Sequence, residues 1–142
     1  MTADGMPASS SAASAPCAPP SGNLIPLLHE IRHALTRWIE QGDEHVIDLR
    51  SIPLAAGEED SLLDQLGAGE VHARLSVMGP SDIIETRFPG VWLITHYNEN
   101  ENIIGRFIEV CEVPGILKSQ AEDSRAGLER LEKELSNAET RA

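Results

Sequence analysis

The first regular apolar pattern in the chain predicts a helix over Leu24–Gln41. Large apolar side chains recur there at intervals of three and four residues, which places them on one face of a helix. That face is formed by Leu24, Leu28, Ile31, Leu35 and Trp38. Asn23 is suited to cap the start of this helix, and Gly42 to end it. We therefore expect an amphipathic helix that packs against the rest of the domain.

The pattern then changes from helical to alternating. A short strand is predicted at residues 44–49, and a short helix at 57–66 with acidic residues in its first turn, where the helix dipole favours them. Four further β segments follow at residues 70–77, 84–88, 91–97 and 106–113. The links between them are too short for a crossover helix, so these strands should form an antiparallel meander.

The two ends of the chain differ from this middle part. Residues 1–22 are rich in Ala, Ser and Pro and are expected to be disordered, because they cannot bury enough apolar surface. A C-terminal helix is predicted over 119–142, with Leu128, Leu131 and Leu135 as a narrow apolar seam. The domain between them, residues 23–118, is predicted to be α+β. It has two layers: a four- to five-stranded, mainly antiparallel sheet with the N-terminal helix on one face, plus the short second helix.

The strands predict a sheet with two apolar faces. The segment VWLITHY is apolar on both sides, and Phe107 shares one side of the last strand with Glu109. One layer of helix covers only one face. The second face therefore requires the C-terminal helix, a second copy of the chain or another partner, and the sequence leaves these three open. In the neighbouring strand, Glu85 and Arg87 alternate with apolar positions, and we expect both to face outward.

The formal net charge is −12 over 142 residues. A field of that sign repels phosphates and anionic lipids, which argues against nucleic-acid or membrane partners. It suits a basic peptide partner, and a solvated surface explains it equally well. No secretory signal or membrane-spanning stretch is predicted, and the two cysteines, Cys17 and Cys111, form no disulfide framework. We expect a cytoplasmic protein.

One motif suggests catalysis. His29-Glu30-Ile31-Arg32-His33 matches H-E-x-x-H, in which two histidines bind zinc and the glutamate acts as general base. On a helix, however, His29 and His33 point away from the apolar stripe, toward solvent. A zinc-dependent hydrolase therefore stays an alternative, together with a generic protein-interaction module. The favoured hypothesis is a non-enzymatic protein without a cofactor or metal.

Taken as strings, five segments resemble the HupH/HyaF family of hydrogenase expression/formation proteins. They are LLHEIRHAL, IDLRSIPL, LGAGEVHARL, IETRFPGVWLITHY and IEVCEVPGIL, which occur in this order between Leu24 and Leu117. The resemblance implies an acidic, cytoplasmic accessory protein or chaperone in nickel-iron hydrogenase maturation. The implied partner is the Fe–S small-subunit precursor before export, or another maturation factor. Many relatives carry this domain twice, so the resemblance leaves open whether this chain forms a homodimer.

The residues that carry the resemblance, and the apolar face beside them, supply the candidate partner-binding set. It consists of Asp48, Arg50, Glu70, Glu85, Thr86, Arg87, Trp92 and Phe107. Each also has a purely structural interpretation, such as a core position for Trp92 or cross-strand pairing for Glu85. For the glycines of the same segments, Gly67, Gly69 and Gly90, a role in turns is favoured.

Overall fold

The structure is a computed structural model that describes residues 21–76 and 79–141. Of the tail predicted to be disordered, residues 1–20 lie outside the described residues. By internal contacts the chain divides into two compact units, one ending at Cys111 and the other starting at Glu112. Each unit is described by itself.

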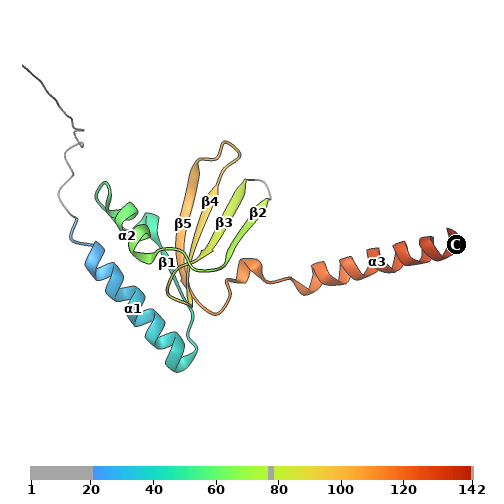
Figure 1. Cartoon of the computed structure of the whole chain (residues 1–142), viewed down its shortest axis with the longest axis horizontal. Helices are drawn as coiled ribbons and strands as arrows, with labels where there is room; N and C mark the ends of the chain where they lie inside the picture. The colour runs from blue at the N-terminus through green and yellow to red at the C-terminus, as the bar shows by residue number, and fades with distance from the viewer. Residues whose placement is uncertain (1–20, 77–78, 142) are drawn as a thin grey trace, which may run out of the picture. The chain divides into compact units, whose positions relative to one another are not determined.

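Over its described residues the first unit contains three helical segments and five strands, whose arrangement can be followed in Figure 1. In chain order they are α1 (Leu24–Gln41), β1 (His45–Asp48), the 3-10 turn η1 (Leu49–Ser51), α2 (Glu58–Leu66), β2 (His72–Ser76), β3 (Pro80–Glu85), β4 (Val91–Tyr97) and β5 (Ile103–Val110). The predicted bounds of α1 are confirmed to the residue. The second unit contains η2 (Gly115–Leu117) and α3 (Ala121–Arg141).

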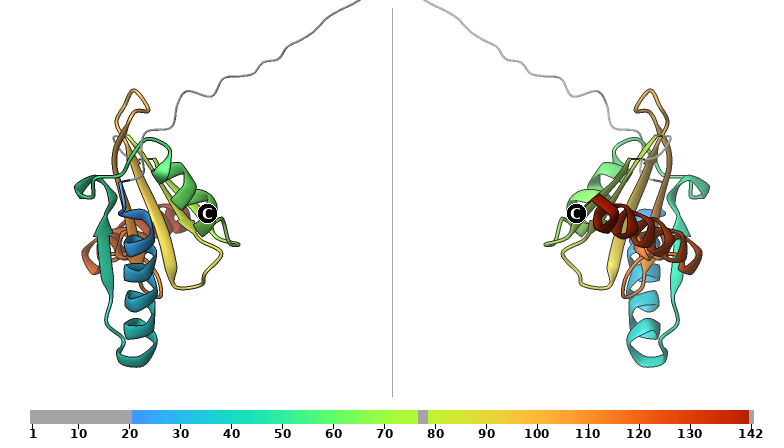
Figure 2. Two further views of the ribbon diagram at one scale, coloured as in Figure 1. Left: turned by 90° about the vertical axis from the view of Figure 1, so that its left-hand side faces the viewer. Right: turned by 90° about the vertical axis from the view of Figure 1, so that its right-hand side faces the viewer.

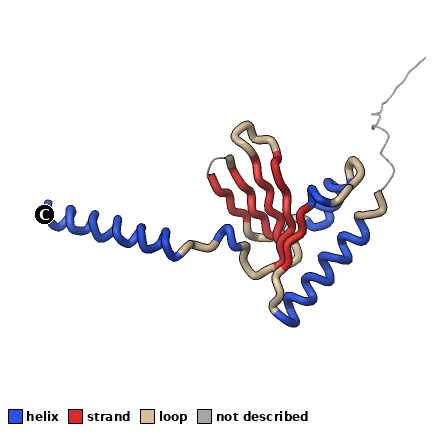
Figure 3. Tube along the Cα trace, turned by 180° about the vertical axis from the view of Figure 1, so that it is seen from behind, coloured by secondary structure: helices blue, strands red, loops and turns tan. Residues whose placement is uncertain are grey.

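The five strands form one sheet, drawn in red in Figure 3. All neighbouring strands are antiparallel, and their order is β1-β5-β4-β3-β2. Strands β2 to β5 are the predicted meander, and β1 joins its edge beside β5. The α+β, two-layer fold class is thereby confirmed. The first and last strands along the chain, β1 and β5, therefore pair with each other.

Helices α1 and α2 cover the same face of this sheet (Figure 2). The buried residues of α1 are Leu27, Ile31 and Ala34, exposed by 6% or less. They pack with α2 against alternate residues of β1, β4 and β5, such as Ile47, Leu93 and Ile108. Burying such a side chain contributes about 1.5–3 kcal/mol. The predicted stripe left out Leu27 and Ala34, so the apolar face of α1 is wider than predicted.

The ends of α1 show one correct and one wrong prediction. Gly42 ends the helix with φ of 76°, and its N–H donates to the carbonyl of Trp38. Asn23 precedes the helix, but its side chain makes no capping hydrogen bond. Its Nδ2 instead donates to the carbonyl of Pro53 at 2.7 Å. The side chain thus donates to a distant carbonyl instead of accepting from a local N–H, which ties the start of α1 to the segment before α2.

The opposite face of the sheet carries Phe107 and Glu109 on the same side, as predicted, because they pair with Ile94 and Trp92 of β4. Ile94 is buried there, whereas Val46 on the edge strand is 56% exposed. Burial raises the pKa of Glu109, the negative charge of Glu44 raises it further, and His96 opposes the shift. This face therefore holds a half-buried carboxyl beside apolar side chains.

In the second unit, α3 extends over 21 residues, and none of them is buried. The three leucines of its predicted seam, Leu128, Leu131 and Leu135, are 53–55% exposed. Acidic Glu122 and Asp123 lie in its first turn, where they complement the helix dipole. No helix among the described residues is long and apolar enough to cross a bilayer.

Candidate functional site

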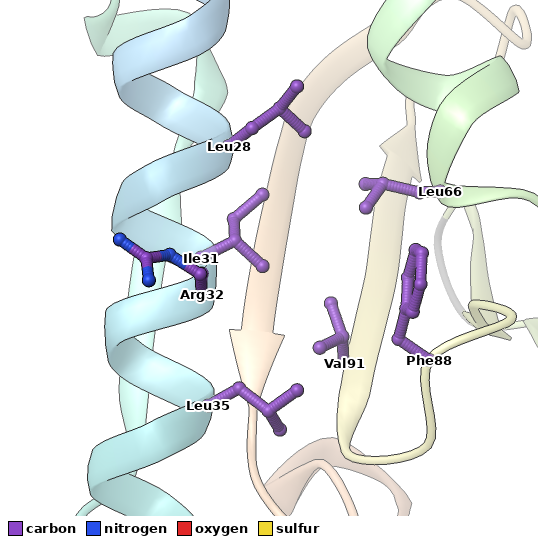
Figure 4. A pocket seen from close by; sticks show the side chains of 7 residues that line it. All are labelled: Leu28, Ile31, Arg32, Leu35, Leu66, Phe88 and Val91. Carbon is purple, nitrogen blue, oxygen red and sulfur yellow. The ribbon is translucent and has the colours of Figure 1, made fainter.

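The clearest concave feature of the first unit is an apolar pocket between α1 and α2. It has a volume of about 230 Å³ and is lined by Leu28, Ile31, Arg32, Leu35, Leu66, Phe88 and Val91 (Figure 4). We call it the α1–α2 pocket. Sites for small molecules usually measure roughly 300–1,000 Å³, so this pocket is suited to one large apolar side chain.

The wall of the pocket is built from four segments: α1, the last turn of α2, the turn between β3 and β4, and the start of β4. The α1 stripe supplies Leu28, Ile31 and Leu35, while the last turn of α2 supplies Leu66. Figure 4 shows their side chains directed toward the space between the two helices, with the guanidinium of Arg32 turned away from it. That guanidinium lies 3.2 Å from Nδ1 of His29. Arg32 therefore contributes its aliphatic stem to the pocket and its charge to the rim.

Phe88 forms the accessible side of the pocket, since 40% of it is exposed. It lies in the turn between β3 and β4, and the guanidinium carbon of Arg87 sits 4.8 Å from the centre of its ring. A cation over an aromatic face at this distance is attracted by the ring quadrupole. The contact holds the exposed ring in place, which makes it a preformed surface for an apolar contact.

The turn that carries Phe88 is held by the neighbouring LGAGE segment. The N–H of Gly69 donates to the carbonyl of Glu85 at 2.6 Å, and the N–H of Glu85 donates to the carbonyl of Val71 at 2.9 Å. A Cβ on Gly69 would lie 2.6 Å from the carbonyl oxygen of Thr86. Gly69 is therefore required by close backbone approach. The side chain of Glu85 takes part, because its Oε1 accepts from the N–H of Glu70 at 3.2 Å.

Thr86 and Arg87 complete this clamp. Thr86 is 1% exposed. Its hydroxyl donates to the carbonyl of Val91 at 2.8 Å and accepts from the N–H of Phe88 at 3.2 Å. Arg87 donates from its backbone N–H to Leu66 and from Nε to Gln65, both at 2.9 Å. These two carbonyls belong to the last turn of α2, where carbonyl groups have no N–H donors within the helix. Arg87 thereby caps α2.

The prediction that Glu85 and Arg87 face outward from one strand is wrong. Strand β3 ends at Glu85, and the next residues turn away from the ladder toward α2. The strand predicted at residues 84–88 lies instead at Pro80–Glu85, because the alternation of charged and apolar residues continues past the end of β3 into the turn. Gly90, for which a role in a turn was favoured, has a φ of 96°, and a Cβ there would lie 3.2 Å from Leu35 and Trp38.

The other predicted site residues are distributed over the first unit. Oδ1 of Asp48 accepts from the N–H of Arg50 at 2.9 Å and caps η1. The Arg50 guanidinium donates to the carbonyl of Ile103 at the start of β5. Trp92 is buried, and its Nε1 donates to the carbonyl of Cys111 at 3.2 Å. Phe107 makes an edge contact with His96, with 5.7 Å between ring centroids.

Of the eight predicted residues, the structure gathers Glu70, Glu85, Thr86 and Arg87 at the β3–β4 turn. By register, Asp48, Phe107 and Trp92 share the sheet face opposite the helices with Glu85. The sequence did not bring out the α1–α2 pocket, although it placed three of its residues in the α1 stripe. The remaining sequence signal for the pocket was Phe88, an aromatic residue between two polar residues and the Pro-Gly turn.

The H-E-x-x-H motif lies on the outer side of α1. His29 and His33 are both exposed, which agrees with their predicted direction. Oε2 of Glu30, the proposed general base, lies 3.1 Å from Nε2 of His45 on β1. Within residues 21–76 and 79–141, no cluster of three or more His, Cys, Asp or Glu side chains is arranged to hold a metal ion.

The chain matches one family model over most of its length. Residues 22–138 match the family described as HupH hydrogenase expression protein, C-terminal conserved region. Hydrogenase expression/formation protein HupH of Rhizobium leguminosarum bv. viciae is 32% identical over 127 residues. HupQ of Azotobacter chroococcum is 31% identical over 111 residues. The matches cover 89% and 77% of this chain but only 44% and 39% of those proteins.

A solved structure supports the same assignment. Hydrogenase expression protein HupH from Thiobacillus denitrificans superposes with a TM-score of 0.79 at 39% identity, covering 84% of this chain and 99% of that one. The chain belongs to the HupH family. It spans less than half the length of the curated relatives, and its domain corresponds to the C-terminal region of the family.

Proposed function

We propose that this chain is a non-catalytic chaperone in nickel-iron hydrogenase maturation that binds the small-subunit precursor before export. The observation that carries this proposal is the family match over residues 22–138, which includes every described element of the first unit. The relatives are named for hydrogenase expression or formation. The precursor as the specific partner is our inference from the resemblance of the sequence to this family.

The geometry of the first unit supports binding over catalysis. The seven residues that line the α1–α2 pocket include no carboxylate, histidine or hydroxyl that could act as an acid, base or nucleophile. The charged groups at the nearby turn are engaged in holding backbone, as Arg87 is with Gln65 and Leu66. What remains is an apolar pocket with one partly exposed aromatic ring, which fits an apolar side chain of a peptide or protein.

The charge of the chain adds a second, longer-range contribution. A net charge of −12 attracts a partner that carries basic residues, and such steering mainly increases the association rate. Exposed charges are screened within about 8 Å at physiological ionic strength. Association with the precursor should therefore slow as salt rises, while the apolar contact at Phe88 persists.

The test is complementation in a hydrogenase-producing host that lacks its own HupH-type protein. The tagged chain should restore hydrogenase activity and copurify with the small-subunit precursor. Phe88→Ala removes the exposed pocket wall but keeps the turn's backbone, and it should reduce both readouts at least several-fold. Ile39→Ala is the matched control, because Ile39 is 69% exposed and does not line the pocket. Restored activity without any associated precursor would contradict the proposed partner.

A further inference from the structure

The leucine seam of α3 continues in both directions as a strict heptad pattern. With Leu128 at the first core position, the spacing of alternately three and four residues runs through the whole helix. The positions are Ala121, Ser124, Leu128, Leu131, Leu135 and Ala138. A stripe confined to these two positions per heptad is the pattern of a coiled-coil seam, narrower than the face that packs on a sheet. None of these residues is buried in the single chain.

The charged residues beside the seam distinguish the possible arrangements of two such helices. In a parallel, in-register pair, Glu134 of one helix faces Glu139 of the other, so two like-charge contacts form. In an antiparallel pair centred between Ser124 and Leu135, the layers join Ala121 to Ala138, Ser124 to Leu135 and Leu128 to Leu131. Arg125 then lies next to Glu132 of the second helix, and this opposite-charge contact occurs twice by symmetry.

We propose that α3 is a self-association surface that pairs antiparallel with α3 of a second copy of this chain. The occupant is a second copy because the seam is complementary to itself in charge and in apolar spacing. Four leucine positions meet in the two central layers, while the outer layers contain only Ala, Ser and Leu. A seam of this size gives a weak, concentration-dependent dimer. This surface is separate from the α1–α2 pocket, so its test is independent of the proposed function.

Two features of α3 fit a helix that is completed by a partner. Helices in proteins gain most of their stability from packing of an apolar face, and α3 has no buried residue that provides such packing. Gly127 lies within the helix, where glycine is less favourable than alanine. In the antiparallel arrangement Gly127 faces Glu134 of the second helix, so the absence of a side chain leaves room for the longer one.

The test is sedimentation of the full chain over a concentration series from roughly 1 µM to 1 mM, which spans weak dimers. The mass should rise from one copy to two, and helix content by circular dichroism should rise with it. Leu131→Asp should abolish the rise. Arg125→Glu and Glu132→Arg should each weaken the dimer at least tenfold, because each places like charges opposite each other. Arg130→Glu, on the outer side of the helix, is the matched control and should leave the dimer unchanged.

The decisive readout is a mixture of the Arg125→Glu and Glu132→Arg proteins. Positions 125 and 132 are both acidic in the first protein and both basic in the second. Only the antiparallel arrangement places position 125 of one helix opposite position 132 of the other, so the mixture should dimerise where each protein alone does not. A chain that stays monomeric throughout the series would overturn the proposal. The same result is expected if α3 packs on the sheet of its own chain. A dimer indifferent to Leu131→Asp, or a mixture that stays monomeric while the unsubstituted chain dimerises, would also overturn it.

Discussion

Helices α1 and α3 have similar lengths, 18 and 21 residues, and each has a single apolar stripe, yet they use it differently. The stripe of α1 includes adjacent pairs, Leu27–Leu28 and Ala34–Leu35, so it is wide enough to lie on a sheet and to line a pocket. The stripe of α3 is one residue wide at every turn and buries nothing in the single chain. The width of an apolar stripe, more than its presence, decides whether a helix joins the core.

The largest expected contrast comes from truncating one core position in each helix. Ile31→Ala should reduce the free energy of unfolding by about 2–5 kcal/mol, because Ile31 is 6% exposed and its removal leaves a cavity. Leu131→Ala should change it by less than ~0.5 kcal/mol in dilute protein, since Leu131 is 53% exposed. Urea denaturation at low micromolar concentration measures both. Equal losses at the two positions would contradict the contrast.

The two regions should also respond oppositely to replacement of glycine by alanine. Gly69→Ala should destabilise the first unit by about 1–3 kcal/mol, because its Cβ would lie 2.6 Å from the Thr86 carbonyl oxygen and force the clamp apart. Gly127→Ala should instead favour the α3 helix by up to about 1 kcal/mol. Thermal unfolding monitors the first change and circular dichroism at 222 nm the second. A neutral Gly69→Ala would show that the clamp is loose.

The smallest expected effect involves Glu109 on the sheet face opposite α1. Its pKa is raised by burial, so the folded state binds the proton more tightly than the unfolded chain. Its contribution to stability is complete below the unfolded pKa and is lost as pH rises through the folded pKa. Glu109→Gln should therefore raise the urea midpoint at pH 7 and leave it unchanged near pH 3, below the ordinary glutamate pKa of about 4.3. A lower midpoint at pH 7 would refute this assignment.

Much of the fold could be predicted because its signals are local. The spacing of apolar residues defined α1 to the residue, Gly42 ends α1 as predicted, and Gly67, for which a role in a turn was favoured, ends α2. The short links between strands predicted the meander without any knowledge of register. These features depend on neighbours within a few residues, which a single sequence displays directly.

The rest depended on contacts between distant segments. Asn23 has the right side chain to cap α1, but Pro53 offers its carbonyl instead, thirty residues further along. Arg87 follows an alternating pattern, yet the free carbonyls at the end of α2 draw it out of the strand direction. The α1–α2 pocket likewise exists only because Leu66 and Phe88 meet the α1 stripe. Such partners are set by the tertiary fold, so local patterns cannot indicate them.

The central claim, that this chain binds the hydrogenase small-subunit precursor through the α1–α2 pocket, is tested most directly by calorimetric titration with purified precursor. We predict saturable binding that weakens as salt rises. Phe88→Ala should raise the dissociation constant at least tenfold, about 1.4 kcal/mol, and Ile39→Ala should leave it within twofold. No detectable binding by a folded chain that still restores hydrogenase activity in cells, or equal affinity of the two variants, would contradict the account.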